Sequence, residues 1–192
     1  MGGASNGIGC GGGNKEYNCF SYRIMWRREG YGEAYLYLPL LYQEPGFCDS
    51  LPRCKASEPS VECNICNSDT GISLQRASFQ FRRGQWNSLK LQMRLNTPNI
   101  TDGMISHTVN GELAIEKNNV NWRLTDHVKI EGINIASWYG GSDATWAPSQ
   151  DMHVYMKNFR MYYDGPTDNL ARNVPAQTGP QVVIYEEIDE AP

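Results

Sequence analysis

The sequence predicts an all-β domain, arranged as a sandwich or a jelly roll. Several segments alternate apolar and polar side chains, which is the pattern of a strand with one buried face. Turn-forming residues separate these segments, and no stretch of useful length shows the helical period. The 19 glycines, 11 tyrosines and 5 tryptophans also fit a turn-rich β protein. We therefore expect strands packed around one core, without long helices.

Two of the predicted strands, residues 20–26 and 33–38, follow each other across a short turn. In both, apolar residues alternate with polar or aromatic ones, so each strand has one face for the core and one face outward. The outward residues are Ser21, Arg23 and Met25 on the first strand and Glu33, Tyr35 and Tyr37 on the second. The second strand ends at Pro39, because proline lacks the amide hydrogen that a strand ladder needs.

The remaining strands are expected downstream of this pair. They cover residues 71–82, 86–96, 104–109, 112–116, 128–137 and 152–162. The second of them has an outward row formed by Lys90, Gln92 and Arg94. Asn110-Gly111, between two of these strands, is the strongest short signal for a hairpin, because both residues tolerate positive φ angles.

We expect one domain over residues 1–167, followed by a flexible linker and acidic tail over residues 168–192. The tail could instead be an edge strand or a peptide that binds a partner. It holds five acids and one arginine, so it carries the whole formal charge of −4. The neutral body disfavours nucleic acid, and any site for a polyanion must be a local cluster of Lys and Arg. No apolar run approaches the length of a membrane span.

The six cysteines all fall in the first third of the chain, at Cys10, Cys19, Cys48, Cys54, Cys63 and Cys66. An even number at short spacings in loop-like sequence is typical of disulfides in a secreted protein. The alternative is a zinc site from the last four, although no second Cys-x-x-Cys accompanies the first. The N-terminus shows no signal peptide, which conflicts with secretion and suggests a truncated start. The histidines have no metal spacing and are expected at the surface.

The row of Arg and Tyr side chains on the two early strands has two interpretations. A solvated sheet face commonly carries such residues. A face that holds an anionic polymer would use Arg for bidentate binding of carboxylates, and Tyr for stacking and for its titratable hydroxyl. Lys90, Gln92 and Arg94 would extend this face if their strand lies in the same sheet.

Residues 19–27 (CFSYRIMWR) and 32–39 (GEAYLYLP) resemble two signature strands of polysaccharide lyase family 14, which includes alginate and glucuronan-type lyases. Further matches are RASF at 76–79, GQW at 84–86, RLN at 94–96, Asn110-Gly111, YGGSD at 139–143, Trp146 and Asn158-Phe159. The resemblance covers roughly residues 2–163 and is most specific in its first block. It implies a β-jelly roll of two antiparallel sheets, with an acidic polysaccharide bound in a cleft on the concave sheet.

The resemblance assigns the chemistry to Ser21, Arg23, Tyr35 and Tyr37, in a β-elimination of 4-linked uronates. Arg23, helped by Gln92, would neutralise the uronate carboxylate and so make the C5 proton more acidic. Tyr35 would take that proton and protonate the departing O4, if the guanidinium lowers its pKa toward neutrality. Tyr37 would hold the substrate, and Ser21 would orient Arg23 or the sugar.

By the same resemblance, Cys10–Cys19 and Cys48–Cys54 would be disulfides, and Cys63–Cys66 an additional one. One departure is a catalytic lysine that the family carries in a stretch before the cysteine loop. Because Met1-Gly2-Gly3 matches only the end of that stretch, this lysine and the first strand or two are expected to be missing.

We therefore expect a polyuronate lyase, impaired by the loss of that lysine. The alternatives are a carbohydrate-binding jelly roll without activity and a truncated product with neither function. The residues expected to bind substrate are Lys90, Gln92, Arg94 and Arg76. The protein is expected to be a secreted monomer that binds an acidic polysaccharide and needs no metal or cofactor.

Overall fold

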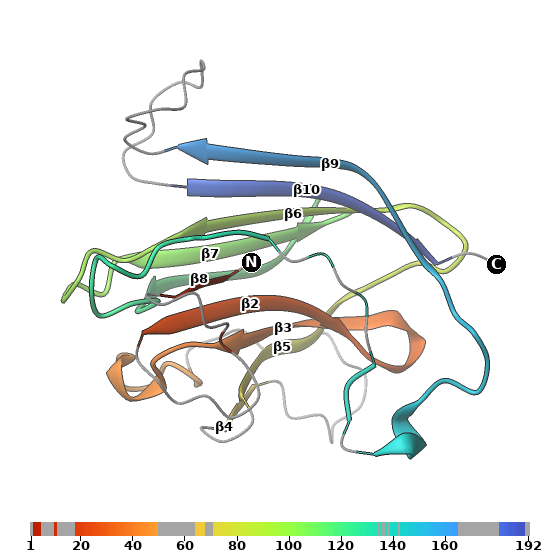
Figure 1. The fold of residues 1–192 in the computed structure, drawn as a ribbon, viewed down its shortest axis with the longest axis horizontal. Coiled ribbons are helices and arrows are strands. Elements are labelled where there is room, and N and C mark those ends of the chain that lie inside the picture. The colour runs from red at the N-terminus through yellow and green to blue at the C-terminus, as the bar shows by residue number, and fades with distance from the viewer. Residues whose placement is uncertain are drawn as a thin grey trace.

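The computed structural model describes residues 2–4, 10, 18–49, 64–67, 71–133, 135, 137, 139–141, 143–164 and 181–190. Two five-stranded antiparallel sheets face each other (Figure 1). Sheet A has the order β1-β2-β3-β5-β4, with the bounds Gly2–Ala4, Cys19–Trp26, Tyr31–Tyr37, Gly71–Gln80 and Ile65–Asn67. Sheet B has the order β8-β7-β6-β10-β9, with the bounds Glu112–Val120, Gly103–Val109, Asn87–Arg94, Gln181–Glu190 and Val154–Asp164. The predicted all-β class is confirmed.

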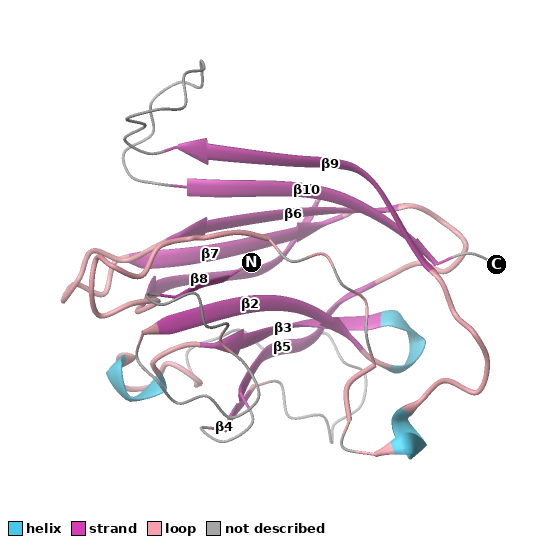
Figure 2. Cartoon of the chain, in the orientation of Figure 1, coloured by secondary structure: helices cyan, strands magenta, loops and turns pink. Residues whose placement is uncertain are grey.

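Among the described residues, helical structure is limited to short turns between strands (Figure 2). These are the 3-10 turns η1 (Arg28–Gly30), η2 (Leu40–Tyr42) and η3 (Ala144–Trp146). Within the part of the chain that the structure describes, no helix is long and apolar enough to span a membrane.

The core lies between the sheets and contains the alternate residues that the apolar pattern predicts. Sheet A contributes Phe20, Tyr22, Ala34, Leu36, Ile72 and Leu74, and sheet B contributes Leu89, Leu91, Met93, Ile105, Val109 and Ile115. Trp122, just after β8, is fully buried, with its ring centroid 5.7 Å from that of Phe20. Because successive strand residues point to opposite faces, burying the apolar row of β2 and β3 turns their polar row outward.

The predicted hairpin at Asn110-Gly111 joins β7 to β8 and is confirmed. Asn110 has φ 52° and Gly111 has φ 84°, the positive angles that a two-residue hairpin turn requires. The Asn110 side chain also accepts a hydrogen bond from the Ser88 amide at 2.9 Å and donates one to the Asn87 Oδ1 at 3.0 Å. The turn is thereby tied to the start of β6.

The strand predicted over residues 128–137 is not formed by the described residues of that segment. Its ladder contact is a single bridge between Gly2 and Gly132. The Gly2 amide donates to the Gly132 carbonyl at 3.2 Å, and the Glu131 amide donates to the Gly2 carbonyl at 3.1 Å. The neighbouring edge strand, β1, is three residues long, so it offers no ladder on which a longer strand could form.

Gln181–Glu190, which belong to the expected acidic tail, form the strand β10. This strand lies between β6 and β9 and pairs with both. Its register sets Val182 opposite Met93 and Ile184 opposite Leu91. The expected linker at 168–180 lies outside the described residues, and the domain boundary at residue 167 stays a prediction.

The cysteine pairing agrees with the sequence in one disulfide and differs in the other. Cys10–Cys19 is formed as expected. Cys48 pairs with Cys66, with Cα atoms 6.2 Å apart, so the expected Cys48–Cys54 and Cys63–Cys66 bonds are wrong. Cys66 lies on β4, where pairing with β5 brings it to Cys48 at the edge of the core. This disulfide also takes two of the four ligands of the zinc alternative, and Cys54 and Cys63 lie outside the described residues.

His107 is fully buried between the sheets, contrary to the expectation that all three histidines lie at the surface. The His107 side chain lies on the buried face of β7, and its Nδ1 is 3.0 Å from the Tyr22 hydroxyl. Burial lowers the pKa of the His107 imidazole to about 3 and raises the pKa of Tyr22 above its ordinary range. The pair is therefore neutral in the folded protein. His127 and His153 are exposed, as expected.

This neutral histidine predicts a loss of stability in acid. As pH falls from 6.5, the unfolded chain binds a proton on this side chain that the folded protein does not bind until about pH 3. Its contribution to the free energy of unfolding should therefore fall by about 1.4 kcal/mol per pH unit over that range. Urea unfolding of His107→Gln should show a shallower acid slope than the wild type. The exposed control His127→Gln should keep the wild-type slope, and equal slopes for all three proteins would contradict the assignment.

Candidate active site

The polar residues of β2 and β3 meet on the outer face of sheet A, as the sequence predicts. The antiparallel register sets Ser21 opposite Tyr37 and Arg23 opposite Tyr35. Ser73 of β5 lies on the other side of Tyr35 and continues that row. Neighbouring strands are about 5 Å apart, so a single small ligand could contact residues from more than one of them.

Arg23 and the two tyrosines form one contact group. The Arg23 guanidinium carbon lies 4.7 Å from the centroid of the Tyr37 ring, which is a cation–π distance. The Tyr37 ring meets the Tyr35 ring edge to face, with centroids 5.5 Å apart. All three side chains are half-buried, so they present polar edges to solvent while their positions are fixed by each other.

The environment of Tyr35 does not lower its pKa, which corrects the expectation from sequence. Burial, followed by the hydrogen bond and the charge of Tyr37, raises the pKa of Tyr35 to about 12. Arg23 acts in the expected direction and lowers this pKa, while the charge of Glu33 raises it. Burial penalises the charged phenolate more than the neutral phenol, and this effect on the pKa is larger than the opposite effect of the Arg23 guanidinium. Tyr35 is therefore a phenol at neutral pH in the protein without ligand.

A buried charge cluster centred on Glu33 lies beside Tyr35 on this face, and sequence reasoning gave Glu33 itself no role. The Glu33 carboxylate is 1% exposed and accepts hydrogen bonds from Arg27 at 3.0 and 2.6 Å. It also accepts from the Arg76 Nε and the Ser73 hydroxyl, both at 3.1 Å. The position of Glu33 in the outward row, two residues before Tyr35, could have suggested that its side chain lies near the site. The pairing of Glu33 with Arg76 could not be predicted in this way, because the two residues are 43 positions apart in the sequence.

The residues predicted to bind substrate separate into two groups. Arg76 reaches the outer face of sheet A through its ion pair with Glu33. Lys90, Gln92 and Arg94 lie on β6 of sheet B, so they do not extend the face of Arg23. They point outward, because Leu89, Leu91 and Met93 between them are buried. The expectation that Gln92 helps Arg23 is therefore wrong: the core of the domain lies between them.

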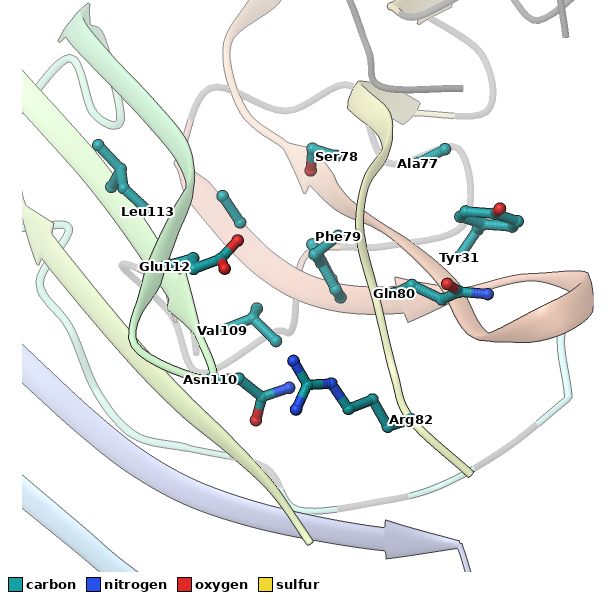
Figure 3. Close-up of a pocket in the computed structure, with 11 residues that line it drawn as sticks. Tyr31, Ala77, Ser78, Phe79, Gln80, Arg82, Val109, Asn110, Glu112 and Leu113 are labelled. Carbon is teal, nitrogen blue, oxygen red and sulfur yellow. The ribbon is translucent and has the colours of Figure 1, made fainter. Parts of the chain in front are cut away.

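A separate cavity of about 250 Å³ opens between β5 and the β7–β8 hairpin (Figure 3). Its lining residues are Tyr31, Ala77, Ser78, Phe79, Gln80, Arg82, Val109, Asn110, Glu112, Leu113 and Ala114. None of Ser21, Arg23, Tyr35 and Tyr37 lines it. The outer face of sheet A that carries Ser21, Arg23, Tyr35 and Tyr37, which we call the tyrosine face, is therefore a different place on the molecule from the cavity.

The two sheets and the Ser-x-Arg and Tyr-x-Tyr rows define the class of protein: a β-jelly roll with an aromatic, arginine-bearing face on one sheet. The chain belongs to polysaccharide lyase family 14, whose model, described as "Polysaccharide lyase 14", matches residues 1–159. This confirms the resemblance that the two signature strands suggested.

Two relatives support the same assignment. A solved structure, the marine PL-14 alginate lyase from Aplysia kurodai, is similar with a TM-score of 0.61 and 26% sequence identity. The match covers 98% of this chain and 60% of that chain. A curated relative, "Exolysin" of Paramecium bursaria Chlorella virus 1, is 26% identical over 129 residues, which is 63% of this chain and 18% of that protein. The chain thus spans less than two thirds of either relative.

Proposed function

We propose that this protein is a lyase that cleaves a 4-linked polyuronate, alginate or glucuronan, by β-elimination on the outer face of sheet A. The observation that carries the proposal is the juxtaposition of Arg23 and Tyr35 on paired positions of β2 and β3. A carboxylate-binding cation then lies next to a group that can exchange a proton, as this reaction requires. The structural relative from Aplysia kurodai is an alginate lyase, which supports the same substrate class.

In the proposed reaction Arg23 binds the carboxylate of the sugar and withdraws negative charge from it. The Tyr35 phenolate removes the C5 proton, the C–H electron pair forms a double bond between C4 and C5, and the C4–O4 bond breaks. Tyr35, now a phenol, gives the proton to the departing O4. Tyr37 holds the sugar against the face, and Ser21 orients Arg23. Arg76 is proposed to bind the carboxylate of a neighbouring sugar unit.

One residue that acts both as base and as acid must reach the C5 proton and O4 from the same side of the ring. This geometry exists in mannuronate and glucuronate, whose C5 hydrogen and O4 share a ring face, and not in guluronate. We therefore expect polymannuronate and glucuronan to be cleaved faster than polyguluronate. Two disulfides fit an oxidising compartment, so we also propose that the protein acts outside the cell as a monomer.

The test is the ultraviolet absorbance of the unsaturated ends that β-elimination creates. Polymannuronate, polyguluronate and glucuronan are each incubated with the protein, and the rise in absorbance is followed with time. A rise with at least one polymer supports the lyase. Binding of the polymers by calorimetry, without any product, would favour the alternative of a non-catalytic carbohydrate-binding jelly roll. Neither binding nor product would reject both functions.

Gly71 offers a prediction about the placement of Tyr35. A Cβ atom at residue 71 would lie 2.9 Å from three atoms of the Tyr35 ring end, and Gly71 has φ +116°. Gly71→Ala should therefore displace the ring and lower the rate about tenfold or more, in addition to destabilising the fold by about 1–2 kcal/mol. Initial rates and urea unfolding measure the two effects.

The matched control is Gly84→Ala. Gly84 also has a positive φ, +65°, and would meet nothing within 4 Å, so a left-handed backbone strain, smaller than that at Gly71, arises without contact with Tyr35. This variant should lose stability and keep its rate. If Gly71→Ala also kept the wild-type rate, the placement of Tyr35 against β5 would not matter for the reaction.

A further inference from the structure

The main-chain carbonyl of Cys10 is a shared anchor for two residues of the tyrosine face. It accepts a hydrogen bond from the Ser21 hydroxyl at 3.1 Å and another from the Arg23 Nη2 at 3.0 Å. Cys10 is itself joined to Cys19, the first residue of β2, by a disulfide. The two cysteines are 7% and 1% exposed, so the disulfide that carries this anchor is buried.

The same disulfide also contacts the tyrosine pair. Tyr37 packs against the buried cluster formed by Cys10 and Cys19. Tyr37 in turn contacts the Arg23 guanidinium and the Tyr35 ring. One covalent link therefore supports Arg23 from two sides, by a hydrogen bond and through an aromatic ring.

The chemical nature of the anchor suits a residue that must bind an anion. The acceptor that Cys10 offers to Arg23 is a neutral carbonyl, so this hydrogen bond fixes the long side chain without itself adding a negative charge. Fixing a flexible side chain before the ligand arrives reduces the entropy lost on binding.

We propose that the Cys10–Cys19 disulfide is a positioning element of this site, which holds the Cys10 carbonyl where it orients Ser21 and Arg23. Loss of the bond would release the carbonyl and allow Arg23 to turn away from Tyr35. The expected loss of catalytic rate rests on the proposed lyase function, whereas the expected change in the pKa of Tyr35 does not. Because Arg23 lowers the pKa of Tyr35, its departure must shift the titration of this tyrosine to higher pH.

The experiment compares two double variants of the full chain that each lack one disulfide. Cys10→Ser with Cys19→Ser removes the proposed positioning element, and Cys48→Ser with Cys66→Ser is the matched control at the other end of sheet A. Rates on the best cleaved polymer give kcat and KM. The Tyr35 titration is obtained from phenolate absorbance, as the difference between each protein and the same protein carrying Tyr35→Phe.

The 10/19 variant should lose about tenfold or more in kcat/KM and titrate Tyr35 at higher pH than the wild type. The 48/66 variant should keep the wild-type kcat/KM and Tyr35 titration, even if its melting temperature falls. A 10/19 variant that is merely less stable, with an unchanged titration and kcat/KM, would overturn the proposal. If the wild type cleaves no polymer, the lyase proposal fails, and the titration still decides the role of the disulfide.

A second measurement covers the case in which the 10/19 variant does not fold. Coupling between two groups is reciprocal, so residues ordered by the disulfide must also protect it. In the single variants Ser21→Ala and Arg23→Ala, Cys10–Cys19 should be reduced at equilibrium in a less reducing thiol buffer than in the wild type, as measured by mass spectrometry of alkylated thiols. The equilibrium of Cys48–Cys66 should be unchanged. An unchanged equilibrium of Cys10–Cys19 in both variants would overturn the proposal.

Discussion

Replacing Tyr35 with phenylalanine is expected to lower kcat of the proposed lyase by about a hundred- to ten-thousandfold, the usual contribution of a general acid or base. The substitution removes one oxygen and keeps the ring that packs on Tyr37. Binding of the polymer should therefore persist, with a KM close to that of the wild type. The measurement is the initial rate of absorbance from unsaturated ends at saturating substrate.

Tyr31→Phe is the matched control for this result. Tyr31 begins the same strand and pairs with Gln80, away from Arg23 and Tyr37. This control should retain the wild-type kcat. If Tyr35→Phe retained it as well, another group must take the C5 proton, and the assignment of Tyr35 would be wrong.

The pH profile gives the same assignment a second test. Because the pKa of Tyr35 is raised to about 12, its phenolate is the minor form at neutral pH. Each unit of pH below that value lowers the phenolate fraction tenfold, so kcat/KM should rise about tenfold per unit between about pH 6 and 9. A plateau that begins near neutrality would mean that the base has a much lower pKa in the free protein than Tyr35 has.

The tyrosine face could be predicted from sequence because it depends on local rules alone. Strict alternation places Ser21 and Arg23 on one face of β2, and Tyr35 and Tyr37 on one face of β3. A short turn between the strands makes them antiparallel neighbours, so the two rows must meet. The family pattern then supplied a reason for these residue types.

The surroundings of that face depend on long-range pairing, which alternation does not encode. The outward row of Lys90 follows the same rule as that of Arg23, yet β6 belongs to the other sheet. Periodicity tells which face of a strand is buried, and not which sheet the strand joins. The pKa of Tyr35 escaped prediction for a related reason, because its shift is dominated by burial, which exists only after folding.

Replacing Glu33 with glutamine is expected to lower the free energy of unfolding by about 2–3 kcal/mol. The substitution keeps the shape of the side chain but removes the charge that two arginines share. Breaking a fully buried ion pair typically costs about 3–5 kcal/mol. The expected loss is smaller here because Arg27 is 38% exposed and can turn toward water, while Arg76, at 23%, is less able to do so.

Glu29→Gln separates the effect of burial from that of charge alone. Glu29 is 59% exposed and lies 3.7 Å from Arg28, so its removal should change the free energy of unfolding by less than about 0.5 kcal/mol. The free energy of unfolding of both variants is measured with urea. The comparison holds when the slope of this free energy against urea concentration is the same as in the wild type. Equal losses in the two variants would show that the Glu33 cluster is worth no more than a surface pair.

The Glu33 variant also tests how the cluster acts on Tyr35. The Glu33 charge raises the pKa of Tyr35, so its removal should lower that pKa and move the rise of kcat/KM toward lower pH. A less stable protein would therefore be a faster lyase at neutral pH, provided that Arg76 keeps its place. Lower stability together with a higher rate at neutral pH would indicate that the Glu33 charge stabilises the fold through the two arginines but also reduces the fraction of Tyr35 that is phenolate. Lower stability with an unshifted pH profile would limit Glu33 to a structural role.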